Sequence, residues 1–343
     1  MFPGRLIFSQ KMNCPTLLLY DMDTKPQITD ITVKPLLNRT HPALKPISGA
    51  LKELWPDVMI GEHCEFVISG APTVIGNLFR VVLGGEIPVR GLSSSPEFLR
   101  SSDAHILPQF ICEQRIPDIP LLQSCPLDAV FTLSAVNNDL AERRPVYTDA
   151  LKQVRGKPGK YFNSRIVICM LKPGTYLEVN NITVSEDIAA RITRGNRRLA
   201  VNTASVPLDD QDSEIGVANP MKTRVSFKTN GTLPAREIMA RACSAITAQT
   251  AHIRGLLPGI NALPSDGATE YTLIVPDSFS AMGATLVKVI TTMYPGVDFI
   301  AHDYVVSERR LTLRLRSSIA ASDVFKNTLQ YIDEVVALVR GAF

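Results

Sequence analysis

The sequence lacks the patterns that mark metal-binding, secreted and membrane proteins. Its six cysteines form no CxxC pair and no histidine lies at zinc-finger spacing, so we expect no metal site and no cofactor. No run approaches the ~18 apolar residues needed to cross a bilayer. The first residues also lack the charged-then-apolar order of a signal peptide. We therefore expect an intracellular protein with reduced thiols and no membrane contact.

An excess of charge of one sign is also missing. Lys and Arg number 36 against 33 Asp and Glu, which leaves a net charge of +3. A net charge this small is not typical of a protein whose whole surface is basic enough to bind nucleic acid. We therefore expect little or no direct DNA contact. The densest basic cluster consists of Arg191, Arg194, Arg197 and Arg198. We interpret it as a solvated face, with contact to an acidic protein surface or to nucleic acid as the alternative.

No arrangement typical of catalysis stands out, and we expect no catalytic residues. The five histidines are dispersed, without a local Ser-His-Asp or Cys-His signature. Asp21 and Asp23 follow a short apolar run and resemble the nucleophile motif of haloacid-dehalogenase phosphatases. Lys25 stands where that motif has Thr or Val. A turn at the end of a strand is therefore the favoured interpretation, and a phosphatase remains an alternative function.

The most informative feature that is present is a short module that occurs twice. In the first copy an apolar strand ends at Ile68 and the helix that follows carries Gly76. In the second copy the strand ends at Val275 and the helix carries Gly283. Eight positions separate the strand end from the glycine in both copies. The repetition predicts two halves that pack on each other, which favours an assembly scaffold over an enzyme.

Apolar periodicity predicts four main helices, over residues 73–83, 234–254, 280–294 and 322–339. Thr73 and Ser322 are the expected N-caps, and Gly84-Gly85 is the expected end of the first helix. A weaker helix is predicted over 44–55. The terminal helix is apolar over more than a third of its girth, so it should pack on more than one surface. The residues expected to pack between the helices are Ile75, Leu78, Phe79, Ile238, Ala242, Met282, Leu286, Phe325, Leu329, Ile332 and Val336.

The middle of the chain has a different apolar periodicity, because patterns typical of strands replace those typical of helices. The clearest runs cover 129–136, 165–171 and 176–184, separated by turn signals. We therefore predict an α+β fold with two dimerisation modules in one chain and a β-rich insert in the first. The predicted parts are an N-terminal extension (1–27), a split dimerisation domain (28–91 and 206–256), the β-rich insert (92–205), a linker (257–268) and a second dimerisation domain (269–343).

Several segments resemble the α-like assembly subunits of multisubunit RNA polymerases. The run Gly76 to Leu83 with Glu86-Ile87-Pro88 is similar to the family's N-L-R-R helix and the strand after it. Gln109 to Leu121 resembles its F-I-x-x-R segment, and Phe227 to Pro234 the approach to its dimerisation helix. These match the D type, equivalent to the eukaryotic third subunit. The second half resembles the L type, or eleventh subunit, through Met282-Gly283 and the run Val297 to Tyr304.

The resemblance covers residues 28–343 and implies a function. The chain would be a fusion of the D and L types, as found in large DNA viruses of eukaryotes, and a non-catalytic assembly platform of a DNA-dependent RNA polymerase. The implied partners are the second-largest, β-like subunit, the largest subunit and small zinc-binding subunits. The implied location is the host cytoplasm or nucleus during infection, with packaging in the virion. The implied large-subunit interface comprises Asn77, Arg80, Glu86, Ile87, Pro88 and Arg115.

Two further functions stay open at this point besides the phosphatase. The β-rich middle is compatible with a viral structural protein, which would assemble in many copies. The arginine cluster is compatible with a nucleic-acid-binding module, whose affinity would depend steeply on salt.

Overall fold

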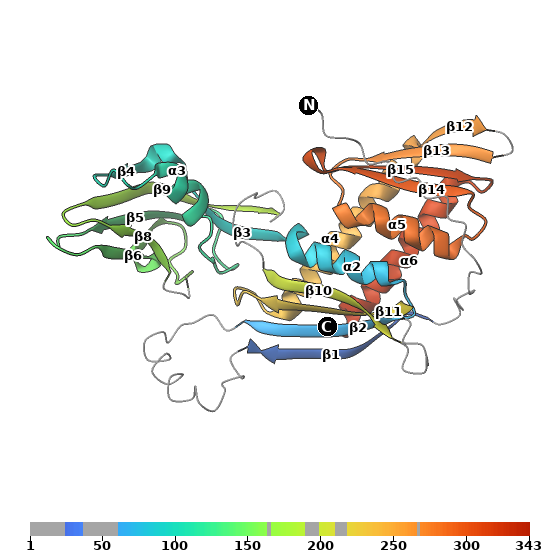
Figure 1. The fold of residues 1–343 in the computed structure, drawn as a ribbon, viewed down its shortest axis with the longest axis horizontal. Coiled ribbons are helices and arrows are strands. Elements are labelled where there is room, and N and C mark those ends of the chain that lie inside the picture. Colours follow the sequence, from blue (N-terminus) through green and yellow to red (C-terminus); the bar gives the residue numbers. More distant parts are fainter. Residues whose placement is uncertain (1–24, 37–60, 163–165, 189–198, 210–217, 266–267) are drawn as a thin grey trace.

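The computed structural model describes residues 25–36, 61–162, 166–188, 199–209, 218–265 and 268–343. Helices and several sheets are mixed, in agreement with the coarse α+β prediction. The described chain forms two bodies, each with its own apolar core (Figure 1). The main body holds residues 25–87 and 199–343 within the described ranges, and the second body holds residues 88–188. None of the helices described is long and apolar enough to cross a membrane.

The first sheet of the main body has four antiparallel strands. In spatial order these are β1 (Gln27–Pro35), β2 (Glu62–Ser69), β11 (Ala218–Thr229) and β10 (Ala200–Asp209). Alternate residues such as Phe66 and Phe227 are fully buried, so one face of the sheet belongs to the core. Helix α2 (Thr73–Val81) follows β2, packs on β10 and β11, and continues as a π-helical turn, η3 (Val82–Glu86).

A second four-stranded antiparallel sheet closes the other side of the main body. Its spatial order is β12 (Asn261–Ser265), β13 (Ala268–Val275), β15 (Arg310–Ser317) and β14 (Phe299–Val305). Helix α5 (Ser280–Met293) follows β13 and packs on β14 and β15. The long helices α4 (Ala235–Leu256) and α6 (Ala321–Ala342) complete the body, with the short 3-10 turns η7 (Leu257–Gly259) and η8 (Val306–Glu308).

The helices lie between the two sheets and pack in pairs, α2 on α5 and α4 on α6 (Figure 1). This layer joins segments from both halves of the sequence into one core. The ring of Phe66 meets Phe79 and the C-terminal Phe343 edge-on. All eleven residues expected to pack between the helices are at most 1% exposed: Ile75, Leu78, Phe79, Ile238, Ala242, Met282, Leu286, Phe325, Leu329, Ile332 and Val336.

The two module glycines allow each helix to lie close to its sheet. A β-carbon at Gly76 would collide with the methyl group of Thr223 on β11. A β-carbon at Gly283 would lie 2.6 Å from both His302 Cδ2 and Leu311 Cδ1, on β14 and β15. The repeated pattern therefore marks two equivalent helix-on-sheet contacts, each of which requires the absence of a side chain.

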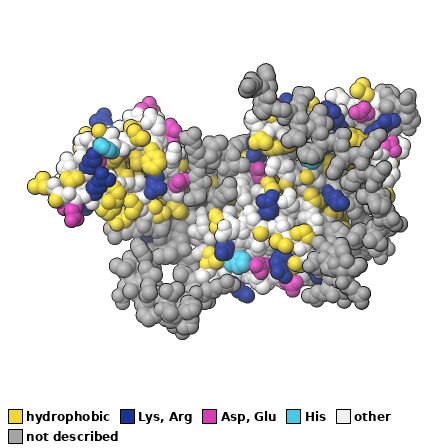
Figure 2. Space-filling view, viewed as in Figure 1, with side chains coloured by type: hydrophobic (Ala, Val, Ile, Leu, Met, Phe, Trp, Pro, Cys, Tyr) yellow, Lys and Arg dark blue, Asp and Glu magenta, His cyan; other side chains and the backbone are white. Residues whose placement is uncertain are grey.

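The second body is built on a five-stranded antiparallel sheet and a two-stranded one. The larger sheet runs β3 (Pro88–Ser93), β9 (Tyr176–Ile188), β5 (Val130–Val136), β7 (Leu151–Arg155), with β4 (Leu99–Ser101) also on β9. The smaller pairs β6 (Arg144–Tyr147) with β8 (Val167–Leu171). Short helical turns complete it: η4 (Pro96–Phe98), α3 (Pro108–Phe110), η5 (Ile111–Arg115) and η6 (Thr148–Ala150). Apolar side chains gather on the face of this body that Figure 2 shows. The exposed apolar residues of the body include Leu107, Leu140 and Val154.

Three helix ends differ from the sequence-based predictions. Thr73 is the first helical residue and not a cap, since Pro72 holds the N-cap position without a side-chain bond. The helix does not stop at Gly84-Gly85 but continues through η3 to Glu86. Ser322 lies inside α6, whose N-cap is Ala320. Burial of Val82 and Leu83 outweighs the ~1 kcal/mol that a helical glycine costs, so the turn persists.

The boundaries of the second body also differ from those predicted. The second body begins at Pro88 and its last strand ends at Ile188, whereas β10 pairs with β11 in the main body. The predicted linker 257–268 contains η7 and strand β12. The predicted helix over 44–55, Asp21 and Asp23, and the arginines of 191–198 lie outside the described residues.

We predict that Leu329→Asp destabilises the chain by about 3–5 kcal/mol, because it places an unpaired carboxylate between α4 and α6. Leu338→Asp on the same helix is the control: Leu338 is 44% exposed, so the change should cost less than ~1 kcal/mol. Urea unfolding followed by circular dichroism measures both. Equal losses for the two variants would contradict the packing of α6.

Candidate functional site

A buried ion pair joins the two halves of the main body. Glu86, at the end of η3, is 5% exposed and accepts two bonds from Arg309, at 2.6 Å from Nη2 to Oε2 and 3.4 Å from Nη1 to Oε1. Arg309 Nε also donates to Asp277 Oδ1 at 3.0 Å. Burial of the guanidinium works to lower the pKa of Arg309, but the bonds and charges from Glu86 and Asp277 raise it above its ordinary value. The Arg309 guanidinium therefore stays charged, and its two bonds to Glu86 hold it in a fixed geometry.

The β14–β15 hairpin positions Arg309 for this contact. Its backbone is left-handed, with φ of 49°, directly after η8. Its carbonyl accepts a bond of 2.7 Å from the Ser278 N–H, and Tyr304 donates through its hydroxyl to the Ser278 carbonyl at 3.0 Å. The hairpin turn and the loop before α5 are thereby tied together. From this turn the side chain of Arg309 extends toward Glu86.

Further polar contacts cross the same interface. Asp333 on α6 accepts from Thr250 Oγ1 at 2.5 Å and from Arg254 Nη2 at 2.7 Å, both on α4. Tyr331 donates to the Gly70 carbonyl at 3.3 Å, and burial raises the pKa of its hydroxyl to about 12. Each contact pairs a residue of the first half with one of the second. Together with the ion pair, and with a bond of 3.1 Å from Arg340 Nη2 on α6 to Ser244 Oγ on α4, they fix the register of a largely apolar interface.

A groove of about 710 Å³ runs beside α4, next to the ion pair. We call it the α4 groove. One wall is a stripe of α4 residues spaced three and four apart: Glu237, Ala240, Arg241, Ser244, Ala248, Gln249 and His252. The other wall consists of Glu86, Pro88, Glu186, Ile188, Asp277, Phe279 and Arg309. The groove thus lies where α4, the start of β3, the end of β9 and the loop before α5 meet.

Gln249 is an unusual member of this wall. Its side chain is 6% exposed, and its Nε2 has no hydrogen-bond partner within the described part of the chain. The residue stands on a helix face that is otherwise apolar, which the sequence already shows. A buried amide donor left without a partner costs roughly 1–3 kcal/mol. The groove therefore carries a destabilising group that packing does not require.

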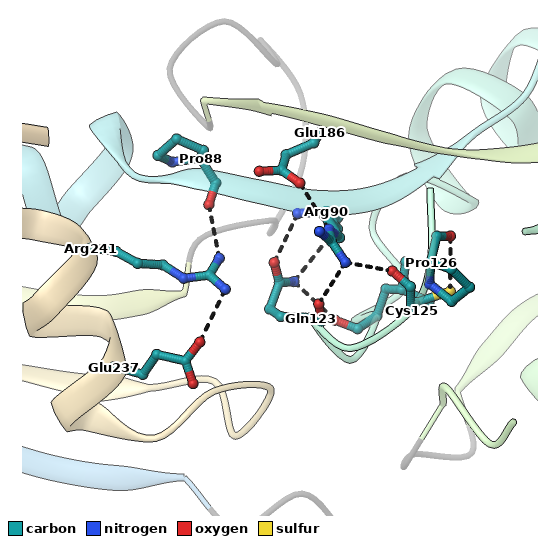
Figure 3. Close-up of polar contacts among 9 residues, drawn as sticks. Pro88, Arg90, Gln123, Cys125, Pro126, Glu186, Glu237 and Arg241 are labelled. Atoms are coloured by element: carbon teal, nitrogen blue, oxygen red, sulfur yellow. Dashed lines mark hydrogen bonds and ion pairs between the residues drawn. The ribbon is translucent and has the colours of Figure 1, made fainter. Parts of the chain in front are cut away.

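Two arginines flank Pro88, where the chain passes from the main body into the second body (Figure 3). Arg241 on α4 pairs with Glu237 at 3.2 Å and reaches the Pro88 carbonyl, at the start of β3, at 3.5 Å. Arg90 on β3 pairs with Glu186 on β9 at 2.8 Å. It also donates through Nη1 to the carbonyls of residues 123 and 125, at 3.1 and 2.9 Å. The chain segment that joins the two bodies at Pro88 is therefore held by Arg241 on the side of the main body and by the contacts of Arg90 on the side of the second body.

The six residues of the predicted large-subunit interface take different positions. Asn77 and Arg80 lie together and partly exposed on α2, with Arg80 Nε bonded to Asn77 Oδ1 at 2.9 Å. Glu86 and Pro88 line the α4 groove, and Glu86 is paired there with Arg309. Ile87 is only 2% exposed. Arg115 bonds the carbonyls of Val167 and Ile168 inside the second body, at 2.6 and 3.2 Å. Asn77, Arg80, Pro88 and Arg115 are partly exposed, whereas Glu86 and Ile87 are buried.

Sequence reasoning missed the residues that organise the site. Arg309 sits in a hairpin turn, where an arginine usually signals exposure, and Asp333 looks like a solvated helix position. Gln249 alone carried a signal, as the polar member of an apolar helix face. Its lack of a partner depends on tertiary structure.

The site offers no obvious chemistry of its own. The described residues include no group of three or more His, Cys, Asp or Glu side chains placed to hold a metal. Burial raises the pKa of the thiols of Cys64 to about 12 and of Cys125, Cys169 and Cys243 to about 11, so these thiols are poor nucleophiles at neutral pH. No family model and no curated protein matches the sequence. Any functional assignment therefore rests on the residues and their geometry.

We predict that Arg309→Met costs about 3 kcal/mol of unfolding free energy, because it leaves the buried Glu86 carboxylate unpaired. The double variant Glu86→Gln/Arg309→Met should lose less than the sum of the two single changes, by more than ~1 kcal/mol. Arg310→Met is the control, since Arg310 and its partner Glu308 are about half exposed. Additive losses in urea unfolding would show that the pair is not coupled.

We also predict that Gln249→Leu raises the stability of the chain by about 1 kcal/mol, because it replaces an unpartnered buried amide with an apolar group of similar size. Thr250→Val, one residue further, is the contrast: it removes a bond to Asp333 and should destabilise. Thermal unfolding of both variants checks the signs. A loss of stability in Gln249→Leu would mean that the amide has a structural partner.

Proposed function

We propose that this chain is a non-catalytic assembly-platform subunit of a multisubunit DNA-dependent RNA polymerase, formed by fusion of a D-type and an L-type module. The observation that carries the proposal is the helix layer. Strand–helix units from both halves, β2–α2 and β13–α5, face each other with α4 and α6 in one core. Fusion makes this pairing intramolecular and raises the effective concentration of the two modules.

On this proposal the second body is the β-rich insert of the D-type module. Strand β2 precedes it in the chain, and β10 and β11 follow it. Strands β2 and β11 are neighbours in one sheet, with residues 222–228 opposite residues 63–69. Such an arrangement is what a domain inserted into a split module requires. Its exposed apolar side chains, such as Leu107 and Leu140, would then serve contacts with other subunits.

The proposed contact with the second-largest, β-like subunit centres on Arg80. Asn77 holds its Nε, while the side chain remains partly exposed on α2. A guanidinium held in this way is suited to bind a carboxylate or backbone carbonyls of a partner. The largest subunit and small zinc-binding subunits are the further proposed partners. Catalysis would belong to the large subunits, in a viral enzyme that works in the host cytoplasm or nucleus and is packaged in the virion.

We predict that Arg80→Ala folds normally but reduces the recovery of polymerase subunits with the tagged chain at least fivefold. The physical reason is that a truncated interface arginine costs about 1–3 kcal/mol of binding, against little for folding when it is partly exposed. Arg100→Ala, at an exposed position on β4, is the control. Mass spectrometry of the purified complexes gives the readout. Recovery of a complete polymerase with Arg80→Ala would contradict the assigned interface, and the absence of polymerase subunits from the wild-type preparation would contradict the function.

A further inference from the structure

Strand β14 is an unprotected edge of the second sheet (Figure 1). It pairs with β15 in continuous register from Phe299 to Val305, and no other described strand pairs with its outer side. Its seven residues include no proline, glycine, lysine or arginine. His302 lies on the side of the sheet that faces α5, next to Gly283, and is nevertheless exposed, as expected where no strand covers the edge beside it.

The other edge strands carry features that keep a sheet from pairing with further chains. Register shifts interrupt β1 and β10, and β10 also contains Pro207. Proline stands in β3, β6 and β12, β4 is three residues long, and β7 is five residues long with Lys152 and Arg155. Side chains of Arg115 and Asn137 bond the carbonyls of β8. Among the described sheets, β14 is therefore the edge left open to strand pairing.

Two opposite charges lie beside this edge, on the face of the sheet turned away from the helices. Ala301 is opposite Arg314 and Asp303 is opposite Thr312, while Leu313 between them is fully buried on the other face. Arg314 and Asp303 are both exposed, and neither makes an ion pair or a hydrogen bond within the described part of the chain. Because alanine is small, the Arg314 side chain can reach across Ala301 to a strand added beside β14.

We propose that β14 of one chain pairs antiparallel with β14 of a second copy, about a two-fold axis at His302. This register uses all seven residues of the strand. It places Phe299 and Ile300 opposite Val305 and Tyr304 of the other copy, which are apolar or aromatic pairs. The two four-stranded sheets then form one continuous sheet across the dimer. The proposal rests on this edge alone and is independent of the polymerase assignment.

The charges select this register over its neighbours. Ala301 faces Asp303 of the other copy, so Arg314 of each chain can reach Asp303 of the other and form two equivalent ion pairs. An axis at residue 301 would bring the two Arg314 side chains together, and one at residue 303 would set the two Asp303 carboxylates opposite each other. Both alternatives also shorten the pairing, to residues 299–303 or 301–305.

The test is sedimentation equilibrium of the full chain over about a hundredfold range of concentration, because the dimer fraction rises with concentration. We expect a reversible monomer–dimer equilibrium. Asp303→Arg and Arg314→Asp each bring like charges together in the dimer, so each should weaken association about tenfold. Glu334→Arg, a charge reversal at an exposed position on α6, is the control and should associate like the wild type. Melting curves confirm that all three variants are folded.

An equimolar mixture of the Asp303→Arg and Arg314→Asp chains is the decisive measurement. In the mixed dimer the introduced arginine faces the introduced aspartate, and the native Arg314 faces the native Asp303, so association should return to the wild-type level. A monomeric wild type, association that neither reversal weakens, or a mixture that stays monomeric would overturn the proposal. Protection of the β14 amides from hydrogen exchange only when polymerase subunits are added would replace the second copy with a strand of a partner.

Discussion

The fold depends on four helices that no single sheet could cover. Helix α6 is buried at Phe325, Leu329 and Val336 but also at Val324 and Val335, so its apolar surface spans much more than one narrow stripe. A helix of this kind is stable only when it is packed on several sides. The first sheet covers the helix layer from one side and the β13–β15 sheet from the other. Each half of the sequence supplies surface that the other half needs, which couples their folding.

The polar groups at this interface add specificity rather than attraction. The Glu86–Arg309 pair is mostly withdrawn from water, and the desolvation of two charges offsets much of their mutual attraction. A mismatched register would, however, leave either charge buried alone at a cost of several kcal/mol. The link from Asp333 to Thr250 and Arg254 acts in the same way between α4 and α6. Apolar contacts could be satisfied by several sliding arrangements, whereas these polar contacts fit one.

Much of the architecture was accessible from the sequence because its signals are local. The periodicity over 280–294 and the strand pattern over 129–136 located α5 and β5 closely. The predicted insert, residues 92–205, wrongly included the first residues of β10, which pairs with β11 in the main body. Distant segments decide which sheet a strand joins, and the sequence of the strand itself would suit either body. The continuation of the first helix through Gly84-Gly85 was missed because a local stop signal of about 1 kcal/mol is overridden by burial of Leu83. The site was least predictable, since Arg309 acts on a carboxylate 223 positions away.

Gln249 shows that a closely packed helix layer can retain a local energetic defect. Every other polar group considered at the helix interface is used: Asp333 accepts two bonds, and Thr250 donates one of them. Gln249 is buried next to them without such a bond among the residues described. An apolar side chain at this position would remove this cost of roughly 1–3 kcal/mol, so the packing of the helix layer does not by itself explain the amide.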